Sequence, residues 1–130
     1  MGKALSAQYS KYEPVPGHFV NGDLTLGENI GDLGGLTVAL KAYHISLEGK
    51  EAPVMDGFTG DQRVLLSWAQ VWRSKYRDEV MKEQLATDPH SPPHYRVNGI
   101  VSSLPVFYTA FDVKEGDKLY IAPENRVKIW

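Results

Sequence analysis

The chain carries the sequence GENIGDLGGL at residues 27–36. Glu28 and Asp32 lie four positions apart in this run, so on a helix their side chains share one face. Two like charges at that spacing destabilise an exposed helix by roughly a few tenths of a kcal/mol. The pair therefore predicts a positively charged neighbour, and a metal ion is one candidate.

The same run opens the longest helix that the sequence predicts, from about Thr25 to Leu47. A stripe of apolar side chains at helical spacing supports this prediction; its members are Leu26, Ile30, Leu33, Leu40 and Leu47. Glycine inside a helix costs up to about 1 kcal/mol relative to alanine, yet the first half of this helix contains Gly27, Gly31, Gly34 and Gly35. Close approach of another backbone would explain why the helix tolerates them.

A purely structural interpretation of the two carboxylates remains open. Thr25 and Glu28 have the spacing of a capping box, in which the glutamate accepts a hydrogen bond from the amide of the capping residue. Asp32 fits an acid of the early helix that the helix dipole favours. The glycines favour a packed functional site instead, because a helix cap requires none of them.

Shorter elements are predicted around this helix from apolar spacing and turn residues. The helices are expected over residues 3–12, from Thr59 or Asp61 to Tyr76, over 77–87 and over 104–111. Short strands are expected at residues 95–101, 119–122 and 127–130. Trp68, Trp72 and Tyr76 share one face of the third helix and are predicted to be core residues. The expected fold class is mainly α with a few short β-strands.

Composition indicates an ordinary globular protein of one domain, residues 1–130. The chain has 42% hydrophobic and 23% charged residues, and its net charge of −2 comes without a basic run. These features argue against nucleic acid and against an anionic membrane surface as partners. No stretch of ~18 apolar residues suggests a membrane span. The absence of cysteine excludes disulfides and thiolate metal sites.

A second motif, DPHSPPHYR, occupies residues 88–96. Taken alone, His90 in a proline-rich loop is typical of a solvated side chain, and Arg96 is typical of a surface charge. Together they suit a site for a peptide, because an imidazole N–H can stabilise developing negative charge and a guanidinium can donate two hydrogen bonds to carbonyl or carboxylate oxygens. His94 lies four positions after His90, but the intervening prolines remove helical geometry, so we expect it to be structural or exposed.

Both motifs resemble segments of the neprilysin and endothelin-converting-enzyme family of zinc metallopeptidases, and the similarity runs from Ala4 to Trp130. The resemblance implies that Glu28 is the third protein ligand of zinc and that Asp32 orients a histidine ligand. It further implies that His90 stabilises the oxyanion of the tetrahedral intermediate and that Arg96 holds a carbonyl of the bound peptide. The implied activity is zinc-dependent hydrolysis of peptide bonds in oligopeptides.

The chain departs from this family because the sequence HExxH occurs nowhere in it. Two expected zinc ligands and the general base are therefore missing. Residues 1–130 are expected to be the helical C-terminal part of a gluzincin-like catalytic domain, inactive without the remainder of that domain. Two alternatives stay open: a non-catalytic helical interaction module that keeps the fold without metal chemistry, or one part of an assembly whose zinc-binding helix comes from another chain.

The expected partners follow from this interpretation. They are a peptide substrate and the rest of the catalytic domain, and the isolated chain is expected to self-associate through the face that this domain would cover. Because the animal members are rich in disulfides and this chain has none, a bacterial oligopeptidase of the cytoplasm or the cell envelope is the expected source.

Overall fold

The computed structural model describes residues 1–129. Its longest helix is α2, Leu26–Ser46. Its bounds agree with the predicted helix to within one residue. The predicted capping box at its start is wrong: Thr25 makes no side-chain cap bond, and its hydroxyl donates to the carbonyl of Asn21 at 3.0 Å. Glu28 is therefore not tied to the helix cap. The helix ends before Glu48 and Gly49, whose φ angles of 51° and 76° are left-handed.

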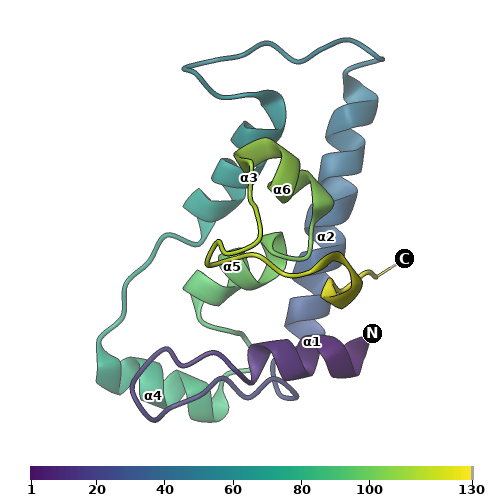
Figure 1. Ribbon diagram of the computed structural model, residues 1–130. Coiled ribbons are helices and arrows are strands. Elements are labelled where there is room, and N and C mark those ends of the chain that lie inside the picture. Colours follow the sequence, from purple (N-terminus) through teal and green to yellow (C-terminus); the bar gives the residue numbers. More distant parts are fainter. Residues whose placement is uncertain (130) are drawn as a thin grey trace.

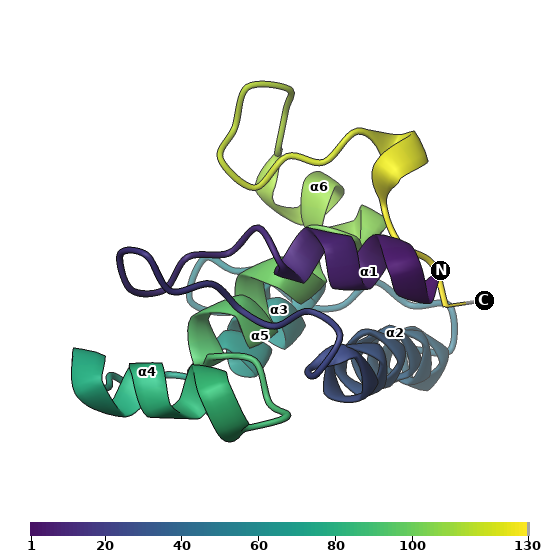
Figure 2. The same ribbon diagram turned by 90° about the horizontal axis from the view of Figure 1, so that it is seen from below.

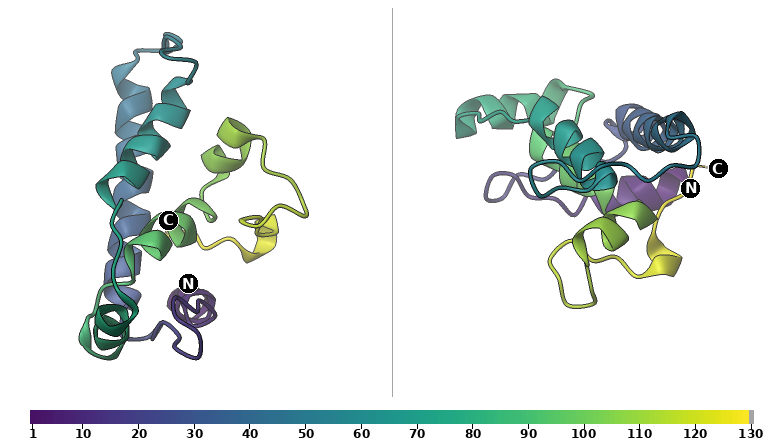
Figure 3. Two further views of the ribbon diagram at one scale, coloured as in Figure 1. Left: turned by 90° about the vertical axis from the view of Figure 1, so that its left-hand side faces the viewer. Right: turned by 90° about the horizontal axis from the view of Figure 1, so that it is seen from above.

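Five further α-helices and one 3₁₀ turn complete the described chain. Their bounds are α1 Gly2–Tyr9, α3 Gly60–Val71, α4 Asp78–Thr87, α5 Pro93–Val101, α6 Pro105–Phe111 and η1 Pro123–Asn125. Helix α5 packs against α1, α2 and α3, while α6 packs against α3. Figure 1 and the left panel of Figure 3 show α2 and α3 upright with α5 at their lower halves, and α4 stands apart at the base. Seen from below, α1 lies between α2 and the C-terminal segment (Figure 2).

The core forms where α1, α2, α3 and α5 meet. It contains the buried side chains of Leu5, Tyr9, Val20, Leu33, Leu36, Leu40, Leu65, Ile100, Val101, Leu104 and Val127. The α2 members belong to the apolar face predicted for that helix. Of the two predicted starts of α3, Thr59 and Asp61, the first is the cap: Thr59 forms a capping box with Gln62.

The segment predicted as a strand at residues 95–101 is helix α5 instead. Proline at the first helical position suits a helix because its missing N–H would have no partner there. The glycine at position 99 of this helix serves close packing. A Cβ atom at this position would lie 2.6 Å from the hydroxyl oxygen of Tyr9, which is fully buried.

Two other predictions also need correction. The third helix ends at Val71 rather than Tyr76, and a non-helical segment separates it from α4. Residues 119–122 and 127–129 form no strand, and Trp130 lies outside the described residues. Within residues 1–129 the β pairing is limited to isolated bridges at Val15–His18 and Met55–Phe58, so the fold is mainly α, as predicted.

The close approach expected at the α2 glycines is not made within the described chain. Gly27, Gly31 and Gly35 have no described atom within 4 Å of where a Cβ atom would stand, whereas Gly34 is buried. Gly31 and Gly35 are exposed, and Val38 and Ile45 continue the same side of α2 at 52% and 67% exposure. We call these four residues the glycine face.

Candidate metal and substrate site

The first turns of α2 and the segment that leads into α5 meet side by side. Each polar residue of the α2 turns has a partner about sixty positions later: Glu28 with His90, Asn29 with Ser91 and Asp32 with Arg96. The two motifs that stood out in the sequence therefore form one site. Glu28, Asp32, His90 and Arg96, the four candidate residues, all belong to it.

Arg96 is the positively charged neighbour that the two carboxylates require. Its Nε and Nη2 atoms donate to the two carboxylate oxygens of Asp32 at 2.6 and 2.7 Å, a bidentate pair. Both side chains are nearly enclosed, at 11% and 9% exposure. Burial alone would lower the pKa of the Arg96 guanidinium, but the hydrogen bonds and charge of Asp32, with the charge of Glu28, outweigh it and raise that pKa.

Aromatic side chains of α3 and its C-terminal end enclose this pair. The guanidinium carbon of Arg96 lies 3.9 Å from the centre of the Trp72 ring, a cation–π contact. Trp68 donates from Nε1 to the carbonyl of Arg96 at 3.1 Å and fits its prediction as a partly buried core residue. Trp72 is partly buried but lies outside the core cluster, and Tyr76 is exposed beyond the end of α3, so the core prediction is wrong for these two residues. Trp72 belongs to the site instead.

Glu28 keeps an accessible carboxylate. Its side chain is 45% exposed, and Oε2 lies 3.2 Å from Nε2 of His90 and 3.5 Å from Nη2 of Arg96. A carboxylate oxygen in this position fits one zinc ligand, since zinc accepts carboxylate oxygen together with imidazole nitrogen. Within residues 1–129 no group of three or more His, Cys, Asp or Glu side chains is arranged to hold a metal ion. The chain can thus offer part of a zinc site.

Asp88 orients His90, a role that the sequence analysis missed. Its Oδ1 accepts from the backbone amide of His90 at 2.8 Å and lies 2.6 Å from Nδ1 of the ring. These bonds, the backbone bond first, lower the pKa of the Asp88 carboxyl. The signal was present, because an aspartate two positions before a residue often accepts that residue's amide hydrogen bond in a turn.

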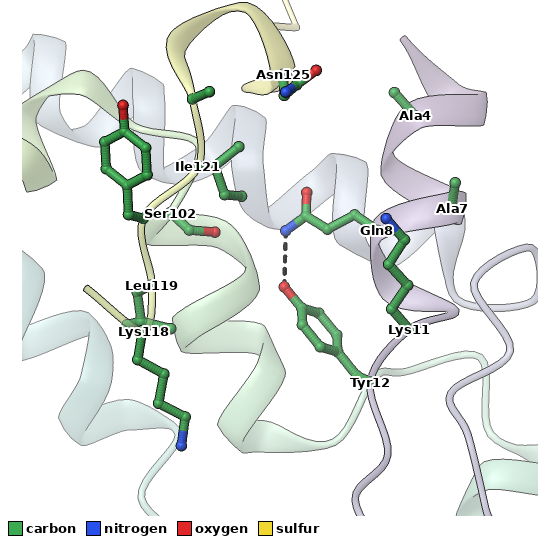
Figure 4. A pocket seen from close by; sticks show the side chains of 12 residues that line it. Ala4, Ala7, Gln8, Lys11, Tyr12, Ser102, Lys118, Leu119, Ile121 and Asn125 are labelled. Carbon is green, nitrogen blue, oxygen red and sulfur yellow. Dashed lines mark hydrogen bonds between the residues drawn. The ribbon is translucent and has the colours of Figure 1, made fainter. Parts of the chain in front are cut away.

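A cavity of about 270 Å³ opens beside these residues. Its walls are Trp72, Tyr76, Gln84, Asp88, His90, Ser91, Pro92, Pro93 and Arg96. His94, in contrast, is exposed on α5, as expected, and does not line this cavity. A larger cavity, of about 620 Å³, lies between α1 and the C-terminal segment, where Gln8 donates to the hydroxyl of Tyr12 (Figure 4). None of the four candidate residues lines that second cavity.

Comparison with known proteins identifies the family. The sequence profile of Peptidase family M13 matches residues 1–127. The chain belongs to this family. Among M13 relatives, an endothelin-converting enzyme homolog of Locusta migratoria is 43% identical over 129 residues, covering 95% of this chain and 17% of the relative. A neutral endopeptidase of Lactococcus lactis is 42% identical over 110 residues, covering 85% of this chain and 16% of the relative.

Solved structures of M13 peptidases have the same fold. The zinc metalloprotease Zmp1 of Mycobacterium tuberculosis, in complex with an inhibitor, superposes with a TM-score of 0.97 at 53% identity over 99% of this chain and 20% of that one. PepO of Lactobacillus rhamnosis gives a TM-score of 0.81 at 34% identity, over 99% of this chain and 19% of that one.

These findings confirm the resemblance to the neprilysin and endothelin-converting-enzyme family and the mainly helical fold class expected from it. The chain spans about a fifth or less of the length of these M13 relatives. Within residues 1–129, the helices lack the combination of length and apolar character that crossing a bilayer requires.

Proposed function

We propose that residues 1–130 are the C-terminal part of the catalytic domain of a zinc metalloendopeptidase that hydrolyses oligopeptides. The observation that carries this proposal is the meeting of Glu28 and Asp32 with His90 and Arg96 in one site, in a chain of family M13. The remaining zinc ligands and the general base would come from the rest of the catalytic domain. Bound zinc would polarise the scissile carbonyl and activate a water molecule.

Glu28 supplies one carboxylate ligand to the metal in this proposal. Its exposed oxygens face out of α2, while the neighbouring Asp32 is enclosed by Arg96. Asp32 then has a double role. Both of its oxygens accept from Arg96, and a carboxylate has further lone pairs that can accept the ring N–H of a zinc-bound histidine.

His90 and Arg96 face the substrate. Asp88 accepts from Nδ1–H of His90. In the imidazolium form of His90, Nε2 also carries a proton and can donate it in a hydrogen bond to the developing oxyanion. Asp32 engages two of the five N–H donors of Arg96, and the remaining donors can bind a substrate carbonyl. The cavity walled by Trp72 and Tyr76 lies next to both residues and offers space for part of the peptide.

Single substitutions in the full-length enzyme test these roles. Glu28→Gln should lose zinc and activity together, because the metal loses a charged ligand. His90→Ala should lower kcat with zinc still bound, and Arg96→Ala should keep zinc and mainly raise KM. Zinc content and steady-state kinetics with an oligopeptide are the measurements.

Glu48→Gln is the matched control for Glu28→Gln, because Glu48 is an exposed carboxylate just beyond the other end of α2. It should change neither zinc content nor kinetics. Equal loss of metal in the Glu28, His90 and Arg96 variants would contradict the separate roles. Full activity in Glu28→Gln would leave the non-catalytic helical module as the better interpretation.

A further inference from the structure

A chain of buried hydrogen bonds runs beside the proposed catalytic residues. The Ser91 hydroxyl donates to Oδ1 of Asn29 at 2.7 Å, and Nδ2 of Asn29 donates to Oγ1 of Thr25 at 3.0 Å. The Thr25 hydroxyl in turn donates a hydrogen bond to the carbonyl of Asn21, also at 3.0 Å. All three side chains are buried, and Asn29 is fully enclosed. Each donor has an acceptor, so the direction of every bond in the chain is fixed.

The residues that form these hydrogen bonds occupy informative positions in the sequence. Asn29 directly follows Glu28, and Ser91 directly follows His90. Within the described residues, no backbone hydrogen bond joins the loop at 89–91 to α2. The Glu28–His90 contact is itself half exposed, so water weakens it. The Ser91–Asn29 bond is therefore the buried polar link that holds the His90 loop in register with the Glu28 turn.

We propose that Asn29 and Ser91 are positioning residues of the peptidase site, holding His90 at a fixed distance from the metal ligand Glu28. This inference rests on the proposed function and names two residues that act through His90. A group that stabilises a transition state must be held to within about 0.5 Å of its productive position. A hydrogen bond in a buried, low-dielectric setting is strong and directional enough to do so.

The competing explanation is that the chain of bonds only stabilises the fold. Loss of the Ser91 hydroxyl would then leave Oδ1 of Asn29 without its donor and lower stability, with no particular effect on the reaction. The two explanations differ in what they predict for kcat once His90 has been removed.

The test uses Ser91→Ala in the full-length enzyme. We expect kcat to fall by about 10- to 100-fold, as a misplaced catalytic group does, with KM and zinc content unchanged. Ser91→Thr keeps the hydroxyl, and the cavity beside Ser91 leaves room for the added methyl group, so this variant should recover most of the lost rate. Ser102→Ala is the matched control: Ser102 is equally buried, but it follows the last residue of α5 and its hydroxyl donates to the Gly99 carbonyl at that end of the helix. It should leave kcat unchanged.

The decisive comparison places Ser91→Ala in the His90→Ala background. If Ser91 acts through His90, the second substitution should cause no further fall in kcat. Multiplicative falls, or an unchanged kcat in Ser91→Ala alone, would overturn the positioning role. If His90→Ala itself leaves kcat unchanged, the proposed function fails instead. Should Ser91→Ala not fold, Ser91→Cys carries the same comparison, since it keeps the shape of the side chain and replaces the hydroxyl with a weak donor.

Discussion

Replacing Arg96 with alanine tests the most enclosed charge pair among residues 1–129. The substitution removes both bidentate bonds and leaves Asp32 as a carboxylate at 9% exposure without its guanidinium partner. It also removes the cation that lies over the Trp72 ring. Breaking a buried pair in this way costs about 3–5 kcal/mol, most of it the penalty of an uncompensated buried charge.

This loss converts into a measurable shift in urea. With a denaturant slope near 1.5 kcal/mol per molar, the midpoint of unfolding should fall by roughly 2–3 M at pH 7. The assay is urea unfolding of the 130-residue chain, followed by tryptophan fluorescence and by far-UV circular dichroism. If the wild-type chain is less stable than the expected loss, Arg96→Ala will be unfolded before any urea is added, and the dichroism spectrum will show it.

Two further variants separate the buried charge from lost packing. The double variant Asp32→Leu/Arg96→Met replaces the pair with apolar side chains of similar volume and should unfold near the wild-type midpoint. Lys114→Ala removes an ion pair with Asp112 on the surface and should leave the midpoint unchanged. A shift below roughly 0.5 M for Arg96→Ala would contradict this prediction, because a loss that small is typical of a weak ion pair screened by solvent.

Three other predictions concern the isolated chain. Isothermal titration should find no sub-micromolar zinc site, and a tight site abolished by Glu28→Ala would contradict this prediction. Burial raises the pKa of the Tyr9 phenol, so the unfolded chain releases this proton first. The contribution of Tyr9 to stability should therefore be fully present below about pH 10 and be lost above it. Tyr9→Phe should flatten that loss in urea titrations from pH 8 to 11. The glycine face should drive self-association in sedimentation, while Gly35→Ala, which meets open space, should raise the stability of the monomer by about 0.5–1 kcal/mol. A monomer with strong amide protection from Ile30 to Leu36 would tell against an uncovered face.

Local signals in the sequence are sufficient to predict helix α2 and the start of helix α3. The apolar stripe and the glycine at position 49 predict the bounds of α2, and Thr59 is one of the two caps predicted for α3. Helix α5 was missed because Val97, Ile100 and Val101 suit a strand as well as a helix. Asn98-Gly99 also imitates a turn, whereas the glycine is required by Tyr9, a residue ninety positions earlier.

Part of the candidate site could likewise be predicted from the sequence, and part of it could not. Its four residues were recognised from their motifs, and the structure brings all four together. The spacing of Glu28 and Asp32 predicted a cation but could not identify it as Arg96, because the partner lies 64 positions along the chain. Asp88 could have been found from its position two residues before His90, while the Trp72 contact depends on how α3 packs.

Asp32 and Arg96 lie 64 positions apart in the sequence. This distance along the chain bears on how the length of the intervening segment can vary. The Asp32–Arg96 pair closes a loop that contains the end of α2, α3 and α4, with both ends of the loop fixed at the site. Doubling the length of a flexible loop costs only about 0.6 kcal/mol in closure entropy. Helix α4 has no fully buried residue. Insertions or deletions around α4 should therefore be tolerated during divergence, and the distance between the two ends of the loop would stay the same.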